Sequence, residues 1–176
     1  MTFSGFVADS VRFVQAHQAF ALPIAFGLAF CESLAFVSLL VPATIILIGV
    51  GAVVGETGLS LMPLVIGAAA GAACGDAVSY WLGSNFKDNI AHVWPLSRDP
   101  GLLTRGRTFF KRWGVFGVFI GRFTGPLRAF VPLSAGMSDM PLLPFFVANV
   151  TSACVWAFVV LAPGALGIPW IKHWLF

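Results

Sequence analysis

Two apolar runs, residues 61–83 and 142–166, constrain the fold of this chain more than any other feature of its sequence. Each run is longer than the roughly 20 residues that a helix needs to cross a bilayer. The composition agrees, because 59% of the residues are hydrophobic and 10% are charged, whereas a soluble domain carries about 25% charged residues. The sequence therefore predicts an all-α integral membrane protein, with residues 1–176 as a single membrane domain.

Basic residues are concentrated between the two halves of the chain. The segment 84–113 contains Lys87, Arg98, Arg105, Arg107, Lys111 and Arg112 against Asp88 and Asp99. The positive-inside rule places this loop in the cytoplasm, and anionic lipid headgroups are its favoured partners. Because membrane segments flank the loop, we do not expect it to bind nucleic acid.

Two segments have the pattern of amphipathic helices. Residues 3–17 and residues 101–113 each place apolar side chains on one helical face and charged side chains off it. Such helices lie in the plane of the membrane interface rather than across it.

Two further segments are apolar but interrupted. Residues 19–54 are apolar apart from Glu32 and are too long for one span yet too short for two spans with a loop. Residues 114–138 form a second such run. The expected interruptions are Pro23, Pro42, Gly49 and Gly51 in the first run, and Gly125, Pro126 and Pro132 in the second. Both runs favour re-entrant helical hairpins, whose broken backbone must be buried in protein or face a wet cavity.

The two full spans contain a row of small residues and a few polar ones. Gly67, Gly71 and Gly75 recur at every fourth position, which predicts the close approach of another helix. Packing does not explain Asp76 in the same span, or Asn149 near the start of the other span.

The two halves show the same features in the same order. Glu32 precedes Pro42 by the same distance as Arg122 precedes Pro132, and Met62-Pro63 and Met140-Pro141 open the two spans. If each half makes one complete crossing, the halves enter from opposite sides. This predicts an inverted repeat, with repeat 1 at about residues 3–83 and repeat 2 at about residues 101–167.

Arg122 and Arg128 stand in an otherwise apolar stretch of the second repeat. On a continuous helix they would be about 600° apart and face different sides, but Gly125-Pro126 interrupts the helix and allows both to converge. A lone arginine at the centre of a bilayer costs about 2.5–3.5 kcal/mol or more. Glu32 and Asp76, the acids within the hydrophobic runs, are their candidate ion-pair partners. The alternatives are a static polar core and a site for an anionic headgroup.

At these residues the sequence resembles the DedA family, part of the VTT-domain membrane proteins, over roughly residues 20–167. The resemblance is carried by Gly121-Arg122-Phe123, Pro126, Arg128, Pro132 and Ala135-Gly136-Met137, with Gly75-Asp76, Tyr80, Gly83 and Glu32. It implies a multi-pass protein of the bacterial inner membrane with two re-entrant hairpins, which translocates lipids and in some members is driven by protons.

The resemblance also implies roles for individual residues. Arg122 and Arg128 would bind substrate, and Glu32 and Asp76 would couple protons or form ion pairs. The supporting residues would be Thr44, Pro42, Gly125, Pro126, Pro132, Asn149 and Tyr80. The family often has a second acid at the position of Thr44, so a relay of two carboxylates in the first hairpin is in doubt.

The leading hypothesis is a flippase or scramblase for an anionic lipid phosphate, such as undecaprenyl phosphate or a phospholipid. A proton-driven exporter of small solutes, a lipid phosphatase and a non-transporting assembly factor stay open as alternatives. The three cysteines and three histidines lack metal-ligand spacing, so neither a metal nor a cofactor is expected. No histidine is near either arginine in the sequence and no paired Asp-rich motif occurs, so an enzyme activity is not expected. The oligomeric state is left open.

Overall fold

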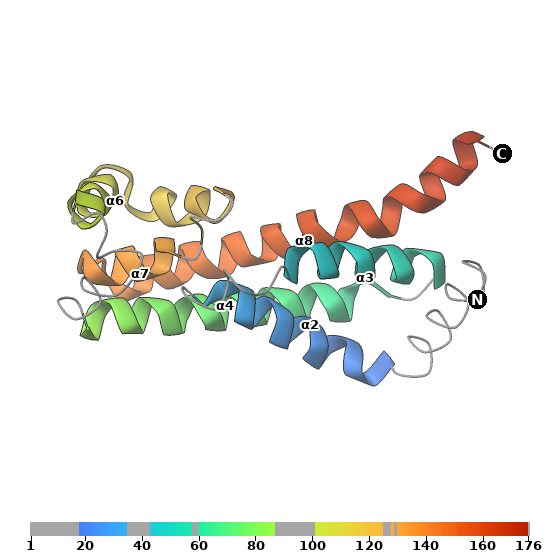
Figure 1. Cartoon of the computed structure of the whole chain (residues 1–176), viewed down its shortest axis with the longest axis horizontal. Helices are drawn as coiled ribbons and strands as arrows, with labels where there is room; N and C mark the ends of the chain where they lie inside the picture. Colours follow the sequence, from blue (N-terminus) through green and yellow to red (C-terminus); the bar gives the residue numbers. More distant parts are fainter. Residues whose placement is uncertain are drawn as a thin grey trace.

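The computed structural model of the chain describes residues 18–34, 43–57, 60–86, 101–124, 128 and 130–175. These residues are helical, and no strand occurs among them. The helices are α2 (Gln18–Ser33), α3 (Ala43–Thr57), α4 (Met62–Asn85), α6 (Gly101–Gly121), α7 (Phe130–Met137) and α8 (Leu142–Leu175) (Figure 1). Outside the described residues lie the amphipathic helix expected at residues 3–17, residues 87–100 of the basic loop, Pro42, Gly125 and Pro126.

Two of the described helices are long and apolar enough to cross a membrane, namely α4 and the part of α8 from Leu142 to Pro163. Both agree with the spans expected from the sequence, although α8 continues as one helix to Leu175. Pro63 lies in the first turn of α4, where its missing amide hydrogen is not needed. The two helices run in opposite directions along the length of the molecule (Figure 1).

The glycine row of α4 lies against α2. A Cβ atom at Gly67, Gly71 or Gly75 would come within 3.0 Å of the carbonyl oxygen of Leu22, Phe26 or Phe30, respectively. Because each step of four residues on α4 matches a step of four on α2, the two helices run parallel. The expected close approach of another helix is therefore confirmed, and its backbone contact requires residues without a side chain.

Several expected interruptions of the helices are wrong. Pro23 lies inside α2, and Gly49 and Gly51 lie inside α3. Gly51 does not break α3 but lets it approach α8, since a Cβ atom there would be 2.6 Å from the Leu161 carbonyl oxygen. Pro132 lies in the first turn of α7, a position that tolerates proline.

A sharp change of direction divides α6 at Gly114, where φ is 50° and ψ is −126°. Figure 1 shows the two parts of α6 pointing in different directions. The part before Gly114 coincides with the amphipathic helix expected at residues 101–113, and the part after it begins the second apolar run. Glycine is suited to this position because its φ is positive, which other residues rarely adopt.

The buried apolar side chains form two clusters. One cluster packs α2, α3, α4 and α8 together and contains Ala72 and Ala153. The other packs α4, α6, α7 and α8 and contains Tyr80 and Ala148. Asp76 falls between the two clusters along α4, which places a buried polar region between two apolar cores, near the middle of both candidate spans.

Candidate functional site

Arg122, directly after the end of α6, forms a buried ion pair with Asp76 of α4. Its Nε donates a hydrogen bond to Oγ of Ser152 at 3.0 Å, and its Nη2 donates to Oδ1 of Asn149 at 2.5 Å. Both charged residues are 6% exposed. A charge buried to this extent must be paired and hydrogen-bonded, and Arg122 meets this requirement.

Asn149 also joins the two candidate spans. Its Nδ2 donates a hydrogen bond to the carbonyl oxygen of Ala73 in α4 at 2.9 Å, while Ser152 Oγ donates to the carbonyl oxygen of Asn149 at 3.1 Å. Arg122 is thus embedded in a network whose members hold one another in place. Such fully bonded networks make a buried polar region rigid.

Arg128 pairs with the other carboxylate, Glu32 at the end of α2. Its Nη2 lies 3.0 Å from Glu32 Oε1, and the hydroxyl of Thr44 donates a hydrogen bond to the same oxygen. The guanidinium carbon of Arg128 lies 4.6 Å from the centroid of the Trp156 ring. This distance is within the range of a cation–π interaction.

The Arg128 pair is less completely bonded than the Arg122 pair. Glu32 Oε2 and Arg128 Nη2 are buried and have no hydrogen-bond partner among the described residues. A buried polar atom without a partner costs about 1–3 kcal/mol. This half of the site therefore keeps hydrogen-bonding capacity that a ligand or a water molecule could use.

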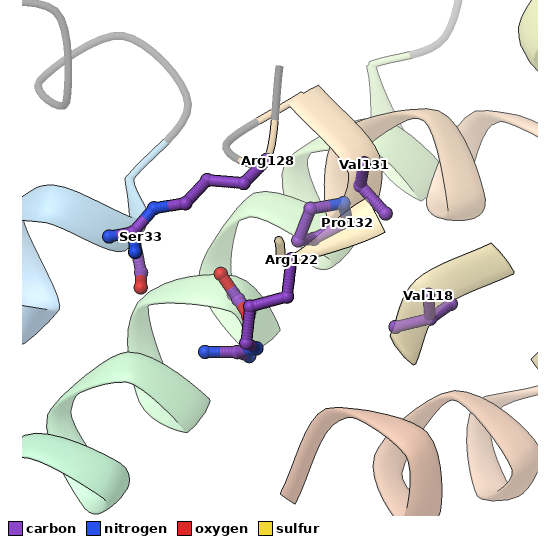
Figure 2. A pocket seen from close by; sticks show the side chains of 7 residues that line it. Ser33, Val118, Arg122, Arg128, Val131 and Pro132 are labelled. Atoms are coloured by element: carbon purple, nitrogen blue, oxygen red, sulfur yellow. The ribbon is translucent and has the colours of Figure 1, made fainter. Parts of the chain in front are cut away.

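A small cavity of about 10 Å³ lies between the two ion pairs. Its lining residues are Ser33, Asp76, Val118, Arg122, Arg128, Val131 and Pro132. Figure 2 shows Arg128 extending toward Ser33 at the end of α2, while Arg122 points in another direction. A cavity of this size holds about one water molecule. Both arginines thus reach one cavity, but each has a carboxylate of its own.

Most of the predicted site residues described by the structure meet in this region. The residues that form the two ion pairs, their hydrogen bonds or the cavity wall are Glu32, Thr44, Asp76, Arg122, Arg128, Pro132 and Asn149. Tyr80 does not, because its hydroxyl donates to the Met140 carbonyl oxygen at 2.5 Å and its ring stacks on Phe145. It belongs to the second apolar cluster and fastens α4 to the start of α8.

Sequence reasoning did not select Ser152 or Trp156 as site residues. Ser152 and Trp156 follow Asn149 by three and seven positions on α8, so the three residues share one face of the helix. A polar residue that recurs at helical spacing inside an apolar span was the available signal. Among the described residues, no group of three His, Cys, Asp or Glu side chains is placed to hold a metal ion.

Comparison with known proteins gives one family. The VTT domain family matches residues 41–166. The chain is 34% identical over 156 residues to the inner membrane protein YabI of Escherichia coli K12, an alignment that covers 88% of this chain and 61% of that protein. It is 30% identical over 152 residues to the uncharacterized membrane protein BU139 of Buchnera aphidicola, covering 86% and 59%.

A third similar protein is the uncharacterized membrane protein Rv2637 of Mycobacterium tuberculosis, 34% identical over 140 residues, covering 76% of this chain and 64% of that one. The chain spans roughly three fifths of the length of these curated relatives. No solved structure matches the chain significantly.

Proposed function

Because the chain belongs to the DedA family of VTT-domain membrane proteins, we propose that it is a lipid transporter that moves an anionic lipid phosphate across the bilayer. Undecaprenyl phosphate and phospholipids are the candidate substrates. The headgroup would pass the arginines while the hydrocarbon tail stays in the bilayer.

The observation that carries this proposal is the incompletely bonded, buried guanidinium of Arg128. Arginine binds phosphate well because its planar group presents N–H donors that match pairs of phosphate oxygens. Unused donors of a cation between two apolar cores lower the stability of the fold. An ion pair with a purely structural role would avoid this loss by bonding all of its donors. Binding of an anionic headgroup supplies the missing acceptors.

The lengths of the short helices support the proposed architecture of two re-entrant hairpins related by an inverted repeat. α2 and α3 have 16 and 15 residues, and α7 has 8, whereas a helix needs about 20 residues to span a bilayer. Glu32 and Thr44 lie at the ends where α2 and α3 adjoin, while Arg122 and Arg128 lie between α6 and α7. We propose that these two tips meet near the midplane from opposite sides.

The described conformation is a closed one in this proposal. A cavity of about 10 Å³ accepts a water molecule but not a phosphate headgroup. Substrate must therefore displace Glu32 from Arg128, and protonation of Glu32 would favour this exchange because it removes the competing negative charge. This is the proposed route by which a proton gradient would drive transport.

The charges also distinguish the remaining candidates. Two arginines oppose two carboxylates in the site, which leaves no net negative charge for the cationic substrate of an exporter. The ion pair of Arg122 with Asp76 and its hydrogen bonds to Ser152 and Asn149 favour a second candidate, a static polar core in a non-transporting assembly factor. Under the leading proposal the Arg122 network is the rigid part of the site and the Arg128 pair is the part that exchanges.

Reconstitution in liposomes tests the proposal. The purified chain is inserted in vesicles containing a fluorescent lipid phosphate, and the fraction of the label accessible from outside is followed over time, with and without an imposed pH gradient. Transport above protein-free vesicles is expected, together with an increase under the gradient. Equal rates in vesicles with and without protein would favour the assembly factor.

A further inference from the structure

Trp156 is a buried aromatic residue that contacts one of the two arginines. It lies in α8, is 4% exposed, and packs in the apolar cluster that contains Ala153 and Ala157. Its ring centroid is 4.6 Å from the guanidinium carbon of Arg128. Because the ring is buried in this cluster, Arg128 contacts an aromatic surface that packing holds in place.

The ring and the carboxylate use different parts of the guanidinium group. The guanidinium carbon of Arg128 lies over the Trp156 ring at 4.6 Å from its centroid, whereas Glu32 Oε1 lies 3.0 Å from Nη2. All N–H donors of a guanidinium lie in its plane. A ring contact centred on the guanidinium carbon does not use these donors, which stay available to carboxylate or phosphate oxygens, whichever is present.

We propose that Trp156 is the positioning residue for Arg128: its ring holds the guanidinium in place while the N–H donors exchange Glu32 for the phosphate group of a lipid. This inference rests on the proposed lipid-phosphate function. It assigns different supports to the two arginines, since Arg122 is held by the hydrogen bonds that it donates to Asn149 and Ser152 and Arg128 by an aromatic ring.

The first experiment measures the ring contact without any transport or ligand. The full chain is labelled with isotopic arginine in micelles, and the side-chain resonance of Arg128 is identified by its absence in Arg128→Lys. The ring current of Trp156 shifts this resonance upfield. Trp156→Leu abolishes the upfield shift, whereas Trp81→Leu, which removes an exposed tryptophan of α4, leaves it in place.

The second experiment measures affinity for dodecyl phosphate, with inorganic phosphate as the lipid-free probe. Trp156→Leu weakens the binding of dodecyl phosphate by about 2-fold to 30-fold, the range of a cation–π contact. Because that substitution can also disturb packing, tryptophans with one, two and three ring fluorines are placed at position 156. They keep the shape of the ring but withdraw electrons from its face, so affinity falls step by step. The same series at Trp81 shows no trend.

The outcomes separate this inference from the proposed function. An Arg128 resonance that is unaltered in Trp156→Leu overturns the inference, whatever the chain transports. A normal ring shift with an affinity that is flat across the fluorinated series overturns it as well. If the unmodified chain binds neither phosphate probe, the proposed function fails, while the ring shift still decides whether Trp156 holds Arg128. Binding of dodecyl phosphate but not inorganic phosphate supports a lipid as the ligand.

Discussion

The hydroxyl of Thr44, in the first turn of α3, donates a hydrogen bond to Oε1 of Glu32, near the end of α2. The same oxygen faces Arg128 at 3.0 Å, while Oε2 has no hydrogen-bond partner among the described residues. Thr44 therefore joins α2 to α3 and aims one carboxylate oxygen at the arginine.

Replacement of this donor tests its contribution. Thr44→Val keeps the size and branching of the side chain but removes the hydroxyl. We expect the free energy of unfolding to fall by about 1.5–3 kcal/mol, the value of a hydrogen bond to a charged group. Denaturant titration in micelles measures the change. The control is Thr151→Val, because the hydroxyl of this exposed threonine bonds the backbone of its own helix. Equal losses in the two variants would contradict the special role of Thr44.

We predict that the stability of the fold depends on the ion pair between Arg122 and Asp76. Asp76→Ala leaves a buried guanidinium without its counter-charge, so we expect a loss of about 3–5 kcal/mol in the free energy of unfolding. Removing both charges in Asp76→Leu/Arg122→Met is expected to restore most of this loss, because the polar core becomes apolar. A double variant as unstable as the single one would show that the pair itself is required for folding.

The elements that the sequence predicted well are those in which one strong local signal decides the structure. Residues 61–83 and 142–166 are uninterrupted apolar runs, and both fold as long helices. Gly114 ends the amphipathic pattern of residues 101–113 and is the point where α6 changes direction. In contrast, Pro23 and Gly51 were misread as breaks, because neighbouring helices decide whether a helix tolerates such residues.

The candidate site could be predicted as a set of residues but not as a set of pairs. Burial of charge in an apolar chain requires compensation, so the positions of Arg122, Arg128, Glu32 and Asp76 within apolar runs identified them as candidates. Which arginine faces which acid depends on how α2 packs on α4 and where α8 passes. Ser152 and Trp156 were missed for the same reason, since serine and tryptophan are unremarkable within a membrane span.

Backbone packing of α2 on α4 gives a further prediction. A Cβ atom at Gly71 would collide with the carbonyl group of Phe26, whereas one at Gly49 would meet nothing within 4 Å. We expect Gly71→Ala to lower the temperature of unfolding and to expose the chain to proteolysis. Gly49→Ala should leave the free energy of unfolding unchanged or raise it by up to about 1 kcal/mol, because alanine is the better helix former. The same behaviour of both variants would show that α2 does not lie on this face of α4.

Opposite ends of α4 should face opposite sides of the membrane. Ser60 and Asn85 are exposed at the two ends of this helix. In a background in which Cys31, Cys74 and Cys154 are replaced by alanine, Ser60→Cys and Asn85→Cys are treated in intact cells with a reagent that does not cross the membrane. We expect Asn85→Cys to be labelled only after permeabilisation, since the basic loop follows it, and Ser60→Cys to react from outside. Labelling of both from one side would overturn the proposed topology.

The central claim, that Arg128 binds the phosphate of a translocated lipid, is tested most directly by the rate of transport in matched liposomes. Arg128→Ala and Arg112→Ala each remove one arginine, but Arg112 is exposed on α6 and lies outside the site. Vesicles contain equal amounts of folded protein, and the movement of a fluorescent lipid phosphate is timed. We predict a rate in Arg128→Ala close to that of protein-free vesicles and a rate in Arg112→Ala close to that of the unmodified chain. A transport rate in Arg128→Ala equal to that of the unmodified chain would contradict the claim.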